Sequence, residues 1–201
     1  MTRQAPCKRG AWRLHDDRET DMTAEVALAA LDTKALRQCL GSFATGVTII
    51  TASTGTELAG VTANSFSSLS LDPPLVLWSL RKQSSSLEKF RRASHFAINI
   101  LAADQSHLAS RFASSTGEKF ASTKWESGRG GAPVLHDVAS VLECRVYRED
   151  DGGDHVIFIG EVEAFHTRDA VPLAFVHGQY ALAMPHPAAQ AVTGDFALGW
   201  G

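Results

Sequence analysis

The sequence predicts a mainly β protein, built as an antiparallel barrel with a few short helices. Runs rich in β-branched and aromatic residues recur along the chain, separated by turns that contain glycine. Most of these runs follow one another directly, without the crossover helix that a parallel βαβ unit needs. We expect about six or seven strands in one domain, because no linker-like stretch divides the chain.

Composition excludes several classes of protein. With 44% hydrophobic and 20% charged residues, the chain has the composition of a folded globular domain. A formal net charge of -3 gives no reason to expect a nucleic-acid partner. No apolar run reaches the roughly 18 residues of a membrane span, so we expect no membrane association. Cys7, Cys39 and Cys144 are widely spaced, which predicts a reduced, cytoplasmic protein rather than a disulfide framework.

The two ends of the chain differ from its middle. Residues 1–31 lack the apolar segment of a signal peptide and are predicted to be a flexible extension. The folded domain is expected over 32–184, followed by a tail over 185–201 that has no strong pattern.

The domain is expected to begin with a helix and a hairpin. Asp32 or Thr33 is a candidate N-cap, and Gly41 stands where the helix would stop. Two β-branched runs follow, over 47–51 and 58–62, joined by a short polar turn. The second run leads directly into residues 60–80.

Residues 60–80 carry an unusual density of small hydroxyl side chains between two strand-like runs. Pro73 and Pro74 end this stretch, and 75–80 resumes as a strand. Small side chains let a ligand approach the backbone N–H groups closely, which favours a binding loop. The alternative is a hydroxyl-rich surface connection. The polar side chains concerned are Thr62, Asn64, Ser65, Ser67, Ser68 and Ser70.

A second helix is predicted to begin near Ser84 or Ser85, because Ser85 and Glu88 have the spacing of a capping box. Its first N–H groups, with Arg81 and Lys82 nearby, could hold a phosphate. The alternative is a capped surface helix without a ligand.

The rest of the chain continues in the same manner. Further strands are expected over 95–101, 138–148, 155–166 and 173–177. A third helix is expected over 104–112, followed by a long mobile loop over 114–133 that contains Lys119, Phe120 and Trp125.

Several familiar catalytic motifs are absent from the sequence. It has no dinucleotide-binding Gly-x-Gly-x-x-Gly after a strand, no P-loop, no His-Glu-x-x-His and no Gly-x-Ser-x-Gly. The eight histidines are scattered, without the short paired spacing of a metal site, so we expect no metal.

Four segments resemble, in order and spacing, the short-chain flavin reductase family, the reductase partners of two-component flavin-dependent monooxygenases. They are Phe43–Thr51, Gly60–Leu80, Gly152–Val162 and Pro172–Tyr180. The resemblance runs from about residue 33 to about residue 183. It implies a flavin-binding split barrel that forms a homodimer, with sites near the subunit interface.

The resemblance also implies a reaction. Hydride would pass from NADH or NADPH to FMN or FAD, and the reduced flavin would diffuse to a separate oxygenase. The sequence distinguishes neither FMN from FAD nor NADH from NADPH. Two alternatives stay open: a flavin-binding carrier or sensor without turnover, and a reductase of another acceptor with a permanently bound flavin. The Gly-Asp-His segment favours an enzyme, because a pure flavin binder needs no nicotinamide contact.

A flavin needs donors along its polar ring edge, an apolar wall and a cradle for its phosphate. The backbone around Thr62, Ala63, Asn64 and Ser65 could donate to the ring edge. Phe66 and Leu69 could line the ring, and Ser84, Ser85 and Lys89 could hold the phosphate. The resemblance adds Ser68, Gln83 and Phe90. As alternatives, the apolar side chains Phe66, Leu69 and Phe90 would lie in the core and Lys89 would be a solvated charge.

His155 is the residue assigned to the nicotinamide nucleotide. In the family that this sequence resembles, the Gly-Asp-His motif contacts that nucleotide, which makes His155 a positioning residue rather than an obligatory acid or base. The alternative is a histidine that faces solvent or bonds locally. The resemblance places a later segment beside the same nucleotide, namely Phe175, Val176, His177, Gly178 and Tyr180. His177 stands where family members vary.

Overall fold

The computed structural model describes residues 32–115 and 118–186. The predicted N-terminal extension over 1–31 and residues 187–201 of the predicted tail lie outside these residues. The domain boundaries at 32 and 184 stay predictions.

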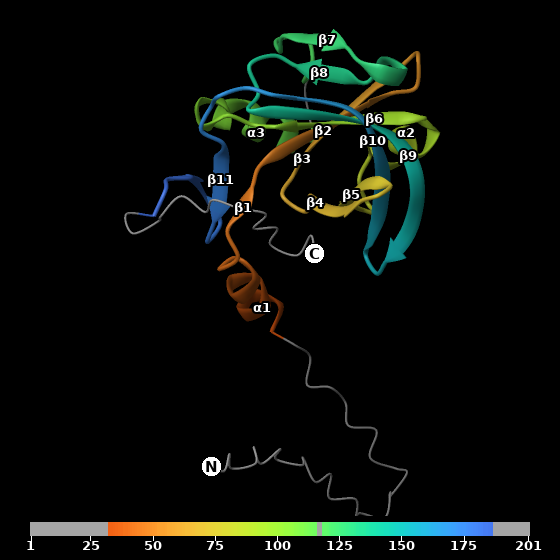
Figure 1. The fold of residues 1–201 in the computed structure, drawn as a ribbon. Coiled ribbons are helices and arrows are strands. Elements are labelled where there is room, and N and C mark those ends of the chain that lie inside the picture. Colours follow the sequence, from red (N-terminus) through yellow and green to blue (C-terminus); the bar gives the residue numbers. More distant parts are fainter. Residues whose placement is uncertain (1–31, 116–117, 187–201) are drawn as a thin grey trace, which may run out of the picture.

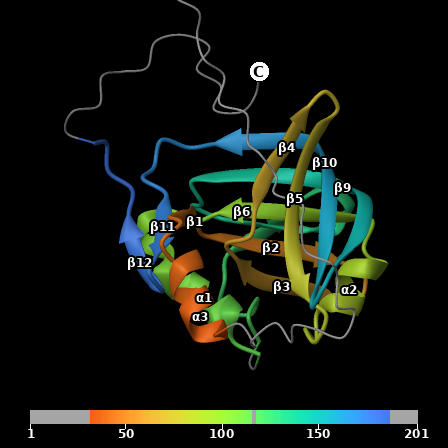
Figure 2. The same cartoon turned by 90° about the horizontal axis from the view of Figure 1, so that it is seen from below.

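A curled antiparallel sheet of seven strands forms the body of the protein (Figures 1 and 2). The curl brings β3 near β5, but within the described residues no ladder joins the outer strands β3 and β4. The barrel is therefore open, which confirms the mainly β, split-barrel prediction. In spatial order the strands are β3 (Leu58–Ala63), β2 (Thr48–Ser53), β6 (His95–Ile100), β9 (Ser140–Gly152), β10 (His155–Thr167), β5 (Pro74–Arg81) and β4 (Ser67–Leu71).

Two small sheets flank the body. One contains β1 (Thr45–Gly46), β11 (Leu173–Val176) and β12 (Gln179–Leu182), and the other pairs β7 (Trp125–Ser127) with β8 (Pro133–Leu135). The β7–β8 pair lies over β2 and β6, so it covers the outer face of the body (Figure 1). The described residues thus contain more strands than predicted. Strands of two to four residues are too short to give a periodic pattern in the sequence.

Within the described residues, three α-helices lie around the sheets: α1 (Thr33–Leu40), α2 (Leu87–Arg92) and α3 (Ser106–Ala113). Short 3-10 turns occupy Ala103–Gln105 and Arg129–Gly131. The N-cap predicted for α1 is confirmed, because Oδ1 of Asp32 accepts hydrogen bonds from the backbone N–H groups of Lys34 and Ala35.

Helix α2 begins later than predicted. Ser86 is its N-cap and makes no side-chain capping bond, so the expected capping box of Ser85 and Glu88 is wrong. The chain first makes a turn, in which the N–H of Ser86 donates to the hydroxyl of Ser84 and the N–H of Leu87 to the carbonyl of Ser84. With only six residues, α2 offers a weak dipole, so a phosphate site here would depend on side chains.

Residues 67–71 were expected to belong to the binding loop, but they form strand β4. Leucines alternate with serines over this stretch, and the strand pairs with β5 through a turn at Asp72 and Pro73 that contains a cis peptide bond. Alternation over so few residues is easily hidden by the high serine content. The loop between β3 and β4 is therefore limited to residues 64–66.

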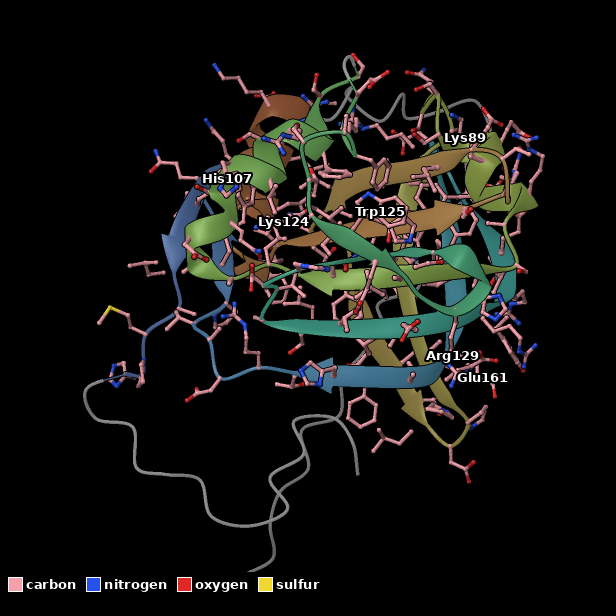
Figure 3. The ribbon with its side chains drawn as sticks, turned by 90° about the horizontal axis from the view of Figure 1, so that it is seen from above. Lys89, His107, Lys124, Trp125, Arg129 and Glu161 are labelled. Atoms are coloured by element: carbon pink, nitrogen blue, oxygen red, sulfur yellow. The ribbon has the colours of Figure 1, made fainter. Side chains whose placement is uncertain are left out.

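The predicted long mobile loop over 114–133 is also shorter in its described part. The ring of Phe120 makes edge contacts with Phe112 at 5.2 Å and with Trp125 at 6.0 Å, measured between ring centroids. Trp125 then begins β7, and Figure 3 shows it above β2. Packing between these aromatic rings orders residues 120–127. The glycine content and polarity of the sequence did not predict this packing.

The barrel interior is filled by aromatic side chains. Trp78 stacks on Phe158 at 4.8 Å and makes edge contacts with Phe90 and Phe96. All four are at most 2% exposed. This part of the interior is therefore filled, and a ligand would have to bind outside it.

Candidate functional site

A cavity of about 710 Å³ opens at the rim of the barrel, where the ends of β3, β5 and α3 meet the turn before α2. We call it the rim cavity. Residues from distant parts of the sequence come together in it. Among those lining it are eight predicted site residues: Thr62, Ala63, Asn64, Ser65, Gln83, Ser84, Ser85 and His155.

Strand pairing brings His155 to this cavity. His155 begins β10 directly opposite Arg81, the last residue of β5. The hairpin is held to the chain after β5 by the backbone N–H of Lys82, which donates to the carbonyl of Asp154 at 2.9 Å. The ammonium of Lys82 also lies 2.6 Å from the carboxylate of Asp151. Because these contacts anchor the turn, His155 lies beside the residues that leave β5.

The ring of His155 is oriented by its neighbour. Nδ1 of His155 lies 2.7 Å from Oδ1 of Asp154, and the side chain of His155 is 33% exposed. This hydrogen bond holds the pKa of the Asp154 carboxyl below its ordinary value. A carboxylate can only accept, so Nδ1 carries the proton and Nε2 stays available to another partner. Asp154 was not predicted as a site residue, although its place in Gly-Asp-His pointed to it.

Two predicted ligand-binding hydroxyls are already engaged with the backbone. Oγ1 of Thr62 donates to the carbonyl of Ala109 in α3 at 2.6 Å. Oγ of Ser65 donates to the carbonyl of Ser79 and accepts from its N–H, at 3.1 and 3.0 Å. These hydroxyls therefore fix the walls of the rim cavity, while Asn64 lies exposed between them.

Lys119 is a cavity residue that sequence analysis did not assign to the site. Its ammonium donates to the carbonyls of Gly60 and Phe112 at 3.1 and 3.0 Å, which ties β3 to the end of α3. Burial lowers the pKa of Lys119 from its ordinary value. A lone lysine in a polar stretch gave no sequence pattern that could distinguish it from a surface charge.

A second cavity of about 540 Å³ lies next to the rim cavity. The two share Ser85, Ser86, Ser115 and Lys119 as lining residues. Lys89 lines the second cavity and not the rim cavity. The three predicted phosphate ligands are therefore divided: Ser84 lines the rim cavity, Lys89 lines the second cavity and Ser85 lines both.

Four other predicted flavin contacts line neither cavity. Phe90 is 2% exposed and belongs to the aromatic core, and Phe66 packs against that core. Ser68 and Leu69 lie on β4, where Leu69 is 46% exposed. For Phe66 and Phe90 the structure agrees with the alternative of core packing. Ser68 and Leu69 do not line the rim cavity, because they belong to strand β4.

The predicted late segment forms the β11–β12 hairpin, away from the rim cavity. His177, with a φ of 50°, and Gly178, with a φ of 77°, make its turn, and the N–H of His177 donates to the carbonyl of Gly41 at 2.7 Å. The turn lines a separate hollow of about 340 Å³ beside α1. Within one described chain, none of the five predicted residues, Phe175, Val176, His177, Gly178 and Tyr180, lines the rim cavity.

Other kinds of site have no support in the described part of the chain. Within residues 32–115 and 118–186, no three histidine, cysteine or carboxylate side chains come together in a group that could hold a metal ion. None of the helices described has the length and apolar character that a membrane span requires.

Among known proteins, the chain is similar to flavin reductases and to reductase components of monooxygenases. The FMN reductase (NADH) SmoA of Agrobacterium fabrum is 45% identical over 74% of this chain and 85% of its own length. The reductase component of the flavin-dependent trigonelline monooxygenase of Acinetobacter baylyi is 44% identical over 72% of this chain and 47% of its own. The structure of the NADH:FAD oxidoreductase SgcE6 of Streptomyces globisporus, in complex with NAD and FAD fragments, is 36% identical, with a TM-score of 0.73 over 79% of this chain and 96% of that one.

The chain spans only 57% and 47% of the length of two of the curated relatives that it matches. A sequence model of the family described as "flavin reductase like domain" matches residues 40–183. That match covers most of the chain, including every described strand and both cavities. The resemblance carried by the four sequence segments is thereby confirmed, and the chain belongs to the flavin reductase like family.

Proposed function

We propose that this protein is an NAD(P)H:flavin oxidoreductase, the reductase component of a two-component monooxygenase. It would transfer hydride from a nicotinamide nucleotide, with NADH preferred, to FMN or FAD, and the reduced flavin would leave for a separate oxygenase. The observation that carries the proposal is the rim cavity, in which His155 faces the same space as the loop after β3 and the Gln83–Ser85 turn.

The residues of the rim cavity fit a flavin. Ala63 and Val61 supply apolar wall, Asn64 and the adjacent backbone supply hydrogen-bonding groups, and Ser84 and Ser85 supply hydroxyls for a phosphate. Arg81 and Lys119 line the same cavity and add positive charge for an anionic ligand. A volume of about 710 Å³ lies in the range of ligand pockets.

The chemistry asks for orientation more than for acid or base catalysis. When bound, the flavin supplies a hydride acceptor and the nicotinamide a hydride donor, so the protein contributes by holding the two together. Asp154 fixes the ring of His155, and Nε2 of His155 can then donate to or accept from the nicotinamide nucleotide. Ser65, locked to Ser79, keeps the opposite wall in place.

The names of the relatives support the assignment of partners. One is an NADH-dependent FMN reductase, one is the reductase component of a monooxygenase, and the related Streptomyces structure contains NAD and FAD fragments. The names of these proteins include both flavins, so the proposal covers both FMN and FAD. The free thiols Cys39 and Cys144 are consistent with the cytoplasmic location that we propose.

The protein is also proposed to form a homodimer. Helix α1 buries none of its residues, although Leu36 and Leu40 lie one turn apart on one face. Phe43, at 77% exposed, follows that helix, and Tyr180 and Leu182 are exposed on the edge strand β12. A second copy that covers these surfaces would remove apolar area from water and could bring the β11–β12 hairpin to a site in its partner.

The function is tested by measuring NADH consumption with added FMN or FAD, comparing the wild type with His155→Ala. We expect many turnovers that depend on added flavin. The variant should have a KM for NADH raised about tenfold, the cost of one lost polar contact, with a smaller change in kcat.

His107→Ala is the matched control, because His107 lies on α3 and lines neither cavity (Figure 3). It should behave like the wild type. If flavin binds but NADH is not consumed, the protein is a flavin carrier or sensor instead. If flavin stays bound through purification and does not exchange, the reductase serves another acceptor.

A further inference from the structure

We propose that the second cavity receives the adenylate half of FAD, so that FAD is bound in preference to FMN. The inference rests on the proposed flavin reductase function and specifies its substrate. It starts from the division of the predicted phosphate ligands: Ser84 and Lys89, five positions apart in sequence, line two different cavities. A ligand with a single phosphate needs only one of these places.

The two cavities adjoin each other along a shared wall. Ser85 and Ser86 from the turn before α2, with Ser115 and Lys119 from beyond α3, line both of them. A phosphate beside Ser84 and Ser85 would therefore lie at the entrance to the second cavity. That cavity has about 540 Å³, enough for further groups of the ligand rather than for a few waters alone.

Lys119 contributes a hydrogen-bond donor to the second cavity. The ammonium of Lys119 contacts two carbonyls and has no carboxylate partner among the described residues. Glu118 is the one carboxylate among the described residues that line this cavity. The ammonium of Lys119 therefore has a third N–H that a pyrophosphate oxygen can use.

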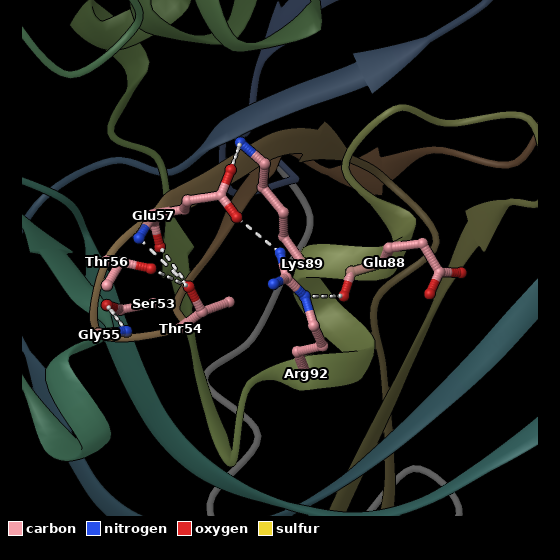
Figure 4. A network of polar contacts seen from close by, with 8 residues as sticks. All are labelled: Ser53, Thr54, Gly55, Thr56, Glu57, Glu88, Lys89 and Arg92. Atoms are coloured by element: carbon pink, nitrogen blue, oxygen red, sulfur yellow. Dashed lines mark hydrogen bonds and ion pairs between the residues drawn. The ribbon is translucent and has the colours of Figure 1, made fainter.

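Lys89 is held at the cavity by Glu57. Nζ of Lys89 lies 3.2 Å from Oε1 of Glu57, and the other oxygen of the same carboxylate accepts from Nη2 of Arg92 at 2.6 Å (Figure 4). This shared carboxylate fixes the position of the Lys89 ammonium at the cavity wall. Glu57 is itself placed by the β2–β3 turn, where its N–H donates to Oγ1 of Thr54. Lys89 is in this way preorganised for an anion.

The remaining wall is apolar and suits a purine. Leu58, Ala59, Phe120 and Ala121 line it. Gly60 allows this wall to form, because a Cβ at that position would lie 2.5 Å from a ring carbon of Phe112 and 2.9 Å from one of Phe120. An adenosine has both the polar groups and the flat apolar face that such a cavity accommodates.

The test uses calorimetric titration of the full-length protein with riboflavin, FMN and FAD, alongside NADH turnover with each flavin. We expect the wild type to bind FAD about tenfold more tightly than FMN, the difference that one added charge-assisted contact supplies. Lys89→Gln should remove most of that difference while changing the FMN dissociation constant less than about twofold. Arg92→Gln is the matched control, since Arg92 shares Glu57 but lines neither cavity, and it should keep the preference.

A second variant protects the test against misfolding. Ala121 is an exposed residue of the second cavity, so Ala121→Glu adds a repelling carboxylate there without disturbing the core, and it should weaken FAD alone. Equal binding of FMN and FAD by the wild type, or equal weakening of both by Lys89→Gln and Ala121→Glu, would overturn the inference. The proposed function is tested independently of this preference, and it fails if NADH is not consumed with any flavin.

Discussion

At the residue scale, local hydrogen bonds decide which side chains a ligand can use. Thr62 and Ser65 have the hydroxyls that favoured a binding loop, yet both bond to backbone carbonyls of neighbouring elements. His155 has the opposite arrangement, because Asp154 engages one ring nitrogen and leaves the other available. Sequence identifies such residue types, but their partners come from other parts of the chain.

Cys144 provides a prediction at this scale. It is fully buried, and burial, followed by the charges of Glu163 and Glu143, raises its pKa to about 12 from an ordinary 9.0. We expect its thiol to resist Ellman's reagent in the folded protein near neutral pH and to react once denaturant is added. The measurement uses a Cys7→Ser/Cys39→Ser variant, in which Cys144 is the single thiol.

The same shift has a consequence for stability. Above pH 9.0 the unfolded chain loses the thiol proton while the folded chain keeps it, so the free energy of unfolding should fall as pH rises toward about 12. In urea titrations, Cys144→Ala should lose this part of the decline. Rapid labelling of the folded protein, or an unchanged decline in Cys144→Ala, would contradict the assignment.

At the element scale, the site depends on how β3 lies against α3. Thr62 bonds to Ala109, Lys119 bridges Gly60 and Phe112, and the rings of Phe112 and Phe120 pack where Gly60 has no side chain. These contacts set the wall between the rim cavity and the second cavity. None of these contacts is visible in the local sequence pattern of β3.

Gly60→Ala tests this packing. The added methyl would overlap the rings of Phe112 and Phe120, whose own contacts leave little room to move, so we expect a loss of about 1 to 3 kcal/mol in unfolding free energy. Gly46→Ala is the control. A Cβ at Gly46 meets nothing within 4 Å, and the change should stay within about 0.5 kcal/mol. Urea denaturation measures both, and equal effects would show that the close approach is unimportant.

At the scale of the whole molecule, the barrel keeps its aromatic interior closed and places both cavities at its rim. The chain also leaves apolar side chains exposed on α1 and β12, which one described copy does not cover. Association of two copies would explain both the exposed apolar surfaces and the distance of the β11–β12 hairpin from the rim cavity of its own chain. The proposed homodimer therefore depends on the exposed surfaces of α1 and β12 together.

Substitutions in α1 test the dimer. Leu40→Glu places a charge on the apolar face and should shift the protein from dimer to monomer, measured by light scattering after size-exclusion chromatography. Gln38→Glu adds the same charge on the opposite face of α1 and should leave the dimer intact. Because Leu40 is 64% exposed, its replacement should spare the fold of each subunit. A wild type that is monomeric at all concentrations would rule the dimer out.

The sequence by itself determined the family, the mainly β architecture and the main strands and helices, because β-branched runs, glycine turns and the Asp32 cap act through near neighbours. It also identified eight residues of the rim cavity. Only the tertiary structure decided that Phe90 belongs to the core, that Ser68 and Leu69 lie on an edge strand, and that Lys119 lines both cavities. The physical reason is that burial, ion pairing and cavity shape arise between elements distant in sequence, and no local pattern of residues encodes those distances.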